Sequence, residues 1–266
     1  MSTTLPEGFL PKVLFLAENY GPAYLDGAKW TLIIALIGTL VGCLIGFVCG
    51  VIQTIPIDKN DNICKRCIVG LAKAILTVYV EVFRGTPMMV QAMLFYFGFI
   101  QYTSYRISPI MAGLIVVSIN TGAYMAETMR GGIFSIDKGQ TEGAKAIGMT
   151  HFQTMLYVIL PQAIRNIMPQ IGNNLIINIK DTSVLSVISV TELMFTGKSV
   201  AGTYYTSFES FTIVCAIYLT MTLVCSRLLR LAERRIDGAD SYDLATTDTL
   251  AHTSGMTNYP KPSDKY

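Results

Sequence analysis

Five long apolar segments, separated by shorter polar stretches, form the main pattern of this chain. They occupy residues 30–52, 69–102, 108–126, 166–194 and 208–232. A helix needs about 20 predominantly apolar residues to cross the hydrocarbon core of a bilayer. The first segment alone would reach about 34 Å at the helical rise per residue. The pattern therefore predicts an all-α polytopic membrane protein with five transmembrane helices in one domain.

The first segment carries a glycine at every fourth position: Gly38, Gly42, Gly46 and Gly50. Residues four apart lie on one face of a helix, and small residues allow two helices to approach closely in lipid. We therefore expect this face to pack against another span. The preceding residues 8–24 mix polar, apolar and aromatic side chains, which favours a separate elbow helix in the membrane interface.

Two of the apolar segments have polar interruptions. Residues 69–102 contain Lys73, Glu81, Arg84, Gly85 and Pro87. We expect an interfacial first part, a kink at residues 85–87 and then a span. Residues 166–194 form a span of unusual polar content, and its polar members are Gln170, Asn173, Asn174, Asn178, Lys180 and Asp181.

Composition and charge support a membrane protein and give its orientation. Of the residues, 52% are hydrophobic and 14% charged, whereas a soluble domain carries about 25% charged residues. Basic residues gather in the first break, in the loop at residues 131–161 and after the last span. The basic residues on this side are Lys59, Lys65, Arg66, Lys138, Lys145, Arg227, Arg230, Arg234 and Arg235. The opposite connections hold Arg106 and Lys198, so the positive-inside rule places the N terminus outside.

This orientation divides the chain into three parts. Residues 1–26 form an extracytoplasmic or interfacial segment, and residues 27–235 form the five-helix domain, including the cytoplasmic loop at residues 131–161. Residues 236–266 are polar without an apolar period, which is typical of a disordered cytoplasmic tail. No cleavable signal peptide is expected, because residues 1–22 lack a basic start followed by an apolar run.

The cysteines and histidines indicate neither a metal centre nor an enzyme. Cys64 and Cys67 have metal or redox spacing, but no second pair accompanies them, and His151 and His252 are isolated. The other four cysteines lie in apolar segments, where small core residues are the expected interpretation. A nucleophile–base set is also absent from the sequence. We expect no metal site, no bound cofactor and no nucleic-acid partner.

The loop at residues 139–161 has a local structure that the sequence specifies. Residues 135–139 predict a turn and residues 140–147 a short helix that ends at Gly148 in a left-handed cap. Thr150 and Gln153 then have the spacing of a capping box, and Pro161 is expected to break or kink the following helix. Two short rigid pieces joined by a glycine would form a compact knob. Periodicity alone supports two interpretations equally. The knob could dock in a groove on another protein, or it could be a surface connection that binds nothing.

The same loop resembles the EAA loop of ABC importer permeases. The resemblance is carried by Glu142, Gly143, Ala144 and Gly148 and by the closing pair Leu160-Pro161. The chain departs from the family pattern in having Gly143 as the first small residue and Val158 in place of the usual isoleucine. The implied ATPase-coupling surface comprises Gln140, Glu142, Gly143, Ala144, Lys145, Gly148, Met149 and Pro161, with Ala144, Ile147 and Met149 as its apolar contacts.

Other motifs resemble the polar amino acid uptake branch of that family and extend the likeness over residues 27–231. They include Glu81-x-Phe83-Arg84-Gly85-Thr86-Pro87 with Gln91, Lys180-Asp181-Thr182-Ser183, and Thr191-Glu192-Leu193. The resemblance implies a type I importer permease in the bacterial cytoplasmic membrane. Its implied partners are two ABC ATPase subunits, a second permease chain, an extracytoplasmic amino acid-binding protein and membrane lipid.

ATP and Mg would reside on the ATPase subunits, because this chain has no G-x-x-x-x-G-K-[ST] phosphate loop. The chain itself would then be a transport subunit rather than an enzyme. The implied cargo is a polar amino acid resembling glutamine, arginine or histidine.

Ionisable residues inside the spans are candidates for a substrate pathway, because such groups are costly in lipid and face a partner, a cavity or a substrate. Arg84 could bind a carboxylate, and Glu81 or Asp181 an ammonium group. The remaining candidates for hydrogen bonds to substrate are Gln91, Asn173, Thr182 and Ser183. The competing interpretation pairs Arg84 with Glu81 and Lys180 with Asp181 to hold helices together, and Glu127 with Arg130 forms a predicted helix-surface ion pair.

A second functional class stays open from sequence alone. A secondary transporter or channel would use Glu81, Glu127 or Asp181 as a proton or cation site and would need no ATPase. Transport by the purified chain in liposomes without an ATPase would distinguish this class from an ABC permease.

Overall fold

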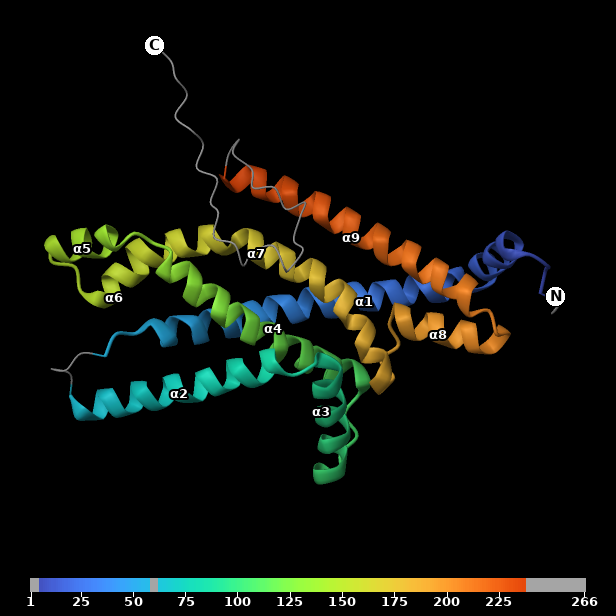
Figure 1. Cartoon of the computed structure of the whole chain (residues 1–266), viewed down its shortest axis with the longest axis horizontal. Helices are drawn as coiled ribbons and strands as arrows, with labels where there is room; N and C mark the ends of the chain where they lie inside the picture. Colours follow the sequence, from blue (N-terminus) through green and yellow to red (C-terminus); the bar gives the residue numbers. More distant parts are fainter. Residues whose placement is uncertain (1–4, 58–61, 238–266) are drawn as a thin grey trace, which may run out of the picture.

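The computed structural model describes residues 5–57 and 62–237, and within these ranges every regular element is helical (Figure 1). The predicted all-α class is therefore confirmed. The helices follow the chain in this order: α1 Phe9–Thr54, α2 Ile63–Gly85, α3 Met88–Thr103, α4 Pro109–Phe134, α5 Lys138–Ala146, α6 His151–Thr154, α7 Leu160–Asp181, α8 Leu193–Tyr204 and α9 Ser207–Asp237. A π-helical segment, Met155–Ile159, and a 3₁₀ segment, Thr182–Ile188, flank α7. The predicted tail at residues 236–266 lies almost wholly outside the described residues.

Three helices in the described part of the chain, α1, α4 and α9, are long and apolar enough to cross a membrane. A fourth candidate is the bent pair His151–Ile188 and Leu193–Tyr204, whose two parts meet at 52°. The remaining predicted span, residues 69–102, is divided between α2 and α3. Its first part carries several charged residues, so hydropathy alone does not identify it as a span.

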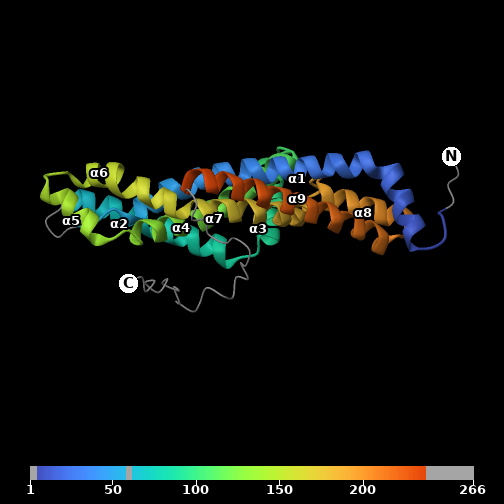
Figure 2. The same ribbon diagram turned by 90° about the horizontal axis from the view of Figure 1, so that it is seen from above.

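The predicted elbow helix at residues 8–24 is not a separate element. Instead α1 runs for 46 residues with Pro22 inside it, and the first turns of the helix bend away from the rest in Figure 2. Proline removes one backbone hydrogen bond and kinks a helix without having to end it. Tyr20 and Tyr24 keep the two parts together, since their hydroxyls bond to the hydroxyls of Tyr204 at 2.9 Å and Ser210 at 2.7 Å.

The glycine face of α1 packs directly against α4, as the four-residue spacing predicts. A Cβ atom at Gly46 would lie 2.3 Å from Cβ of Met125, and one at Gly42 would lie 2.6 Å from Cβ of Thr121. Asn178 of α7 joins the same contact, because its amide nitrogen donates to the hydroxyls of Thr39 at 2.8 Å and Thr121 at 2.9 Å. Three helices therefore meet where only small side chains fit.

The predicted kink at residues 85–87 is confirmed as the break between α2 and α3. The Gln91 amide nitrogen donates to the backbone carbonyls of Phe83 and Thr86, both at 2.9 Å. Asn120 of α4 donates to the Gln91 carbonyl at 2.9 Å and to the Phe83 carbonyl at 3.2 Å. The break is thus closed by side-chain amides that replace the missing helical bonds.

The predicted single span at residues 166–194 is wrong in its bounds. The helix α7 begins at Leu160, and the chain leaves the α-helical path after Asp181, passes through the 3₁₀ segment and turns at Ser189, whose φ is 63°. The polar residues near the end of α7 supply side-chain partners inside the bundle, which permits a broken helix at this depth.

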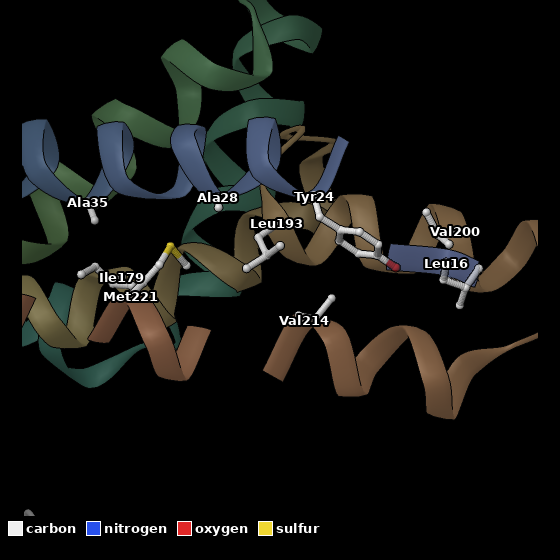
Figure 3. Packing of buried hydrophobic residues seen from close by; sticks show 9 residues of the cluster. All are labelled: Leu16, Tyr24, Ala28, Ala35, Ile179, Leu193, Val200, Val214 and Met221. Atoms are coloured by element: carbon white, nitrogen blue, oxygen red, sulfur yellow. The ribbon is translucent and has the colours of Figure 1, made fainter. Parts of the chain in front are cut away.

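The core at the end of the molecule that holds the N terminus is formed by α1, α7, α8 and α9. Figure 3 shows its members projecting into the space between these helices. The fully or nearly buried side chains are Leu16, Tyr24, Ala28, Ala35, Ile179, Leu193, Val200, Val214 and Met221. Ser210 adds a polar link, because its hydroxyl donates to the Gly197 carbonyl at 2.9 Å. This packing attaches the second half of the chain to α1.

The α1–α4 contact gives a first prediction. Gly46→Ala should destabilise the protein by about 1 to 3 kcal/mol, because the added methyl overlaps Met125 Cβ and the backbone of Ala126. Gly70→Ala on α2 is the control, since a Cβ atom there would have no other atom within 4 Å and alanine favours a helix. Thermal unfolding of the purified proteins in detergent measures both. Equal melting temperatures for Gly46→Ala and the wild type would contradict the close packing.

Candidate functional site

The knob formed by α5 and α6 lies at one end of the elongated molecule, and the first turns of α1 lie at the other (Figures 1 and 2). Asp137 caps α5 by accepting a hydrogen bond from the Gly139 amide at 2.6 Å. Gly148 ends the helix with φ at 84°, and Met149 N donates to the Ala144 carbonyl at 3.1 Å. This is the left-handed cap that the sequence predicts.

The predicted capping box at the start of α6 is also present. Gln153 N donates to the Thr150 hydroxyl at 3.3 Å, and Thr150 N donates to the Gln153 side-chain oxygen at 2.9 Å. Pro161 does not break the following helix, because the π-helical turn at Met155–Ile159 precedes it and the chain stays helical into α7. Since helical residues precede it, Pro161 leaves one backbone carbonyl of the preceding turn without its amide donor.

The predicted coupling residues differ in their exposure to solvent: most lie on the surface of the knob, and one is buried beneath it. Gln140, Glu142, Gly143, Lys145, Gly148 and Pro161 are exposed, and Met149 is half-buried. Ala144 is only 6% exposed, so its predicted role as a surface contact is wrong and it anchors α5 instead. Ile147 and Phe152 are the large apolar side chains on this surface, 79% and 72% exposed. Phe152 was missed by the sequence interpretation.

One histidine, His151, lies in the knob at the start of α6. Partial burial lowers the pKa of His151, and the cations Lys145 and Lys65 lower it further. His151 is therefore neutral at pH 7 and can donate or accept a hydrogen bond there. Beyond the first turn of α5, the charged, exposed groups of α5 and α6 are then Glu142 and Lys145.

A second feature is a charged cleft between the C-terminal end of α1, α2 and α4, with a volume of about 410 Å³. It is lined by Gln53, Lys73, Thr77, Val80, Glu81, Arg84, Glu127 and Arg130. The structure thus brings two of the predicted pathway residues, Glu81 and Arg84, to one cavity. A group of His, Cys, Asp and Glu able to hold a metal is absent from the described residues.

Arg84 pairs with a different residue from the one expected. Its guanidinium lies 3.9 Å from a carboxylate oxygen of Glu127 and 5.5 Å from the centre of the Tyr124 ring. Arg130 also donates to Glu127, with its Nε 3.3 Å from Oε2, so the predicted Glu127–Arg130 pair is confirmed. The expected partner Glu81 is replaced because α4 presents Glu127 to the end of α2.

The other predicted pathway residues lie elsewhere. Gln91 closes the break between α2 and α3, as described above, and Asn173 is half-buried on α7. Asp181 ends α7 and is exposed, Ser183 is half-buried, and Thr182 is buried with its hydroxyl donating to the Ile179 carbonyl at 2.9 Å. Neither Asp181 nor its neighbours line the charged cleft.

Glu192 is a buried carboxylate that the sequence interpretation did not place in a site. It is fully buried and caps α8 by accepting from the amides of Met194 at 2.8 Å and Phe195 at 2.7 Å. Tyr218 of α9 donates to it at 2.8 Å, and Thr31 of α1 at 3.4 Å. The signal that could have identified it is an ionisable residue inside an apolar stretch, because the usual capping pattern would have selected Thr191. The carboxylate joins three helices.

Comparison with known proteins assigns this architecture to a family. Residues 66–238 match the family model described as "Binding-protein-dependent transport system inner membrane component". The chain is 38% identical to the glutamine transport system permease protein GlnP of Escherichia coli (strain K12), covering 81% of this chain and 93% of that protein. It is 34% identical to the nopaline transport system permease protein NocM of Agrobacterium fabrum, covering 83% and 90%.

The solved structures that resemble this chain are also ABC transporters. One chain of an amino acid ABC transporter crystallised with histidines superposes with a TM-score of 0.74 at 36% identity, covering 86% of this chain and 99% of that chain. The MetNI methionine ABC transporter, at 18% identity and a TM-score of 0.68, shares the fold. This chain therefore belongs to the binding-protein-dependent transport system inner membrane components, and it is a multi-pass membrane permease of the ABC importer type.

Proposed function

We propose that this chain is the membrane-spanning permease subunit of an ATP-driven importer of polar amino acids. The observation that carries the proposal is the rigid, doubly capped knob at the end of a permease-family bundle. The names of the relatives support the cargo class, since they describe glutamine and nopaline transport. Glutamine and larger polar or cationic amino acids are the proposed substrates.

ATP hydrolysis would take place on two separate ATPase subunits, because the chain contains no phosphate-binding loop. The knob offers these subunits both polar and apolar contacts, from Glu142, Lys145, Ile147 and Phe152. Rigid caps at Gly148 and Thr150 support this role, since a force-bearing contact requires a surface that keeps its shape. ATP and Mg would be held by the ATPases and not by this chain.

A second permease chain and an extracytoplasmic binding protein complete the proposed complex. The exposed apolar side chains along α2, which include Ile68, Leu71, Ile75, Val78 and Val82, require lipid or another permease chain around them. The N terminus would face the outside and the knob the cytoplasm. The charge distribution supports this orientation, and the two features lie at opposite ends of the molecule (Figure 2).

The first test of this function concerns coupling. Glu142→Lys should abolish or strongly reduce ATP-driven uptake, because it reverses the charge of the docking surface while the spans still insert. Gly148→Val should act similarly, since a β-branched residue is strained at a φ of 84°. Uptake of glutamine and ATPase activity are measured in proteoliposomes containing the whole complex.

Two variants control for charge loss and for simple glycine replacement. Glu142→Gln keeps the size of the side chain, and Gly70→Val replaces a glycine with open space around it. Both should retain most of the uptake activity. If both single variants, Glu142→Lys and Gly148→Val, showed wild-type uptake, the knob would have no role in coupling.

The second test concerns orientation. A single cysteine at Ser199 of α8 should react with an impermeant thiol reagent added to intact cells, with the native cysteines replaced. One at Ser135, beside the knob, should react only after permeabilisation. Both positions are exposed, so access to the reagent depends on the side of the membrane. The reverse pattern would overturn the orientation and the assignment of the knob to the cytoplasm.

The third test concerns the pathway through the bilayer. We propose that Arg84 and Asp181, each at the end of a broken helix, bind opposite ends of the passing amino acid. Arg84→Ala and Asp181→Asn should then reduce transport per assembled complex more than they reduce assembly. Breaking the Arg84–Glu127 pair also leaves a carboxylate with one partner fewer, so assembled complex is quantified separately. Normal turnover at every substrate concentration would exclude both residues from the pathway.

A further inference from the structure

The charged cleft holds more ionic groups than its internal pairs use. Glu127 is the partner of both Arg84 and Arg130, as described above. Within the described part of the chain, Lys73 and Glu81 form no ion pair. A charged side chain beside a membrane-spanning bundle is costly unless it faces a partner, water or a ligand. The cleft therefore presents one cationic and one anionic group whose partners must come from outside the chain.

These two groups share one face of α2. The lining residues of that helix are Lys73, Thr77, Val80, Glu81 and Arg84, and their spacing of three and four residues is that of a single helical face. Lys73 and Glu81 are separated by about 12 Å along the helix axis. The hydroxyl-bearing Thr77 lies between them on the same face and also lines the cleft.

We infer that this cleft is a binding site for the zwitterionic head of an amino acid, apart from Asp181 and on the knob side of the break at residues 85–87. Arg84 also lines the cleft, but its guanidinium is paired with Glu127. Glu81 receives the α-ammonium group, Lys73 receives the α-carboxylate, and Thr77 donates a hydrogen bond to the carboxylate. A volume of about 410 Å³ lies within the range of small-molecule sites. The inference rests on the proposed function, and it adds a station that the substrate occupies shortly before its release.

The position of the cleft supports a release site. Gln53, in the last turns of α1, forms one of its walls, and α2 starts near the end of the molecule that carries the knob (Figure 1). Glu127 and Arg130 lie in the last two turns of α4, which leads directly into α5. A larger hollow, about 660 Å³ between α1 and α9, is lined mainly by apolar side chains with Lys29 as its charged member. It offers no carboxylate for an ammonium group.

Equilibrium binding of radiolabelled glutamine to the purified permease–ATPase complex, without binding protein, tests the site. Two analogues compete: 4-aminobutanamide, which lacks the carboxylate, and 4-carbamoylbutanoic acid, which lacks the ammonium group. The wild type should prefer glutamine to both. Lys73→Met should lower the affinity for glutamine roughly tenfold, because it removes the charge-assisted contact with the α-carboxylate. The same variant should no longer prefer glutamine to 4-aminobutanamide, which has no carboxylate. Glu81→Gln should abolish the preference over 4-carbamoylbutanoic acid.

Lys29→Met and Glu18→Gln serve as matched controls, since both residues are exposed on α1 away from the cleft. They should leave the affinity for glutamine within about twofold of the wild type. Unchanged affinities in Lys73→Met and Glu81→Gln, or an equal loss for glutamine and both analogues, would overturn the inference. So would a wild-type complex that transports glutamine without measurable binding in this assay. A wild-type complex that transports no amino acid would instead reject the proposed function itself.

Discussion

Every helix end that lies inside a bilayer must have its backbone groups satisfied by the protein, because lipid offers no hydrogen bonds. Within the residues that the structure describes, two breaks interrupt predicted spans, one between α2 and α3 and one between α7 and α8. At the first, Gln91 and Asn120 bind the carbonyls that α2 leaves free. Where the chain turns back into α8, Glu192 binds the first amides of that helix. The rest of the bundle is arranged around these two closures.

The closures also connect helices that are distant in sequence. Asn120 belongs to α4, so the first break is attached to the helix that leads into the knob. Glu192 is held by Thr31 of α1 and Tyr218 of α9. Asn178 ties α7 to both α1 and α4. Polar side chains in this protein therefore act as links between rigid helices, in positions where a wholly apolar side chain would leave backbone or hydroxyl groups without partners.

The contact of α1 with α4 gives the knob a firm base. Glycines allow the two backbones to approach so closely that a Cβ at Gly46 would overlap Met125. The last turns of α4 carry Glu127 and Arg130 and then continue through a short turn into α5. In the proposed importer, a displacement of the knob by an ATPase would be carried along α4 to the charged cleft. The same helix would thus transmit the force and change the shape of the cleft.

The sequence by itself determined the features that depend on local spacing. The all-α class, the glycine face of α1, the kink at residues 85–87, the glycine cap at Gly148 and the capping box at Thr150 all follow from neighbouring residues, because helix periodicity and capping are short-range effects. The resemblance of the loop to the EAA pattern added the family, which the comparisons confirm.

Only the tertiary structure decided which distant groups meet. It joined residues 8–24 to the first span, since aromatic contacts with α8 and α9 support the helix across Pro22. It buried Ala144 and exposed Phe152, and it paired Arg84 with Glu127 of α4 and left Glu81 facing the cleft with Lys73. It also made Glu192 a junction of three helices. Such pairings depend on how helices cross and rotate against one another, and sequence spacing along one helix contains no information about its neighbours' faces.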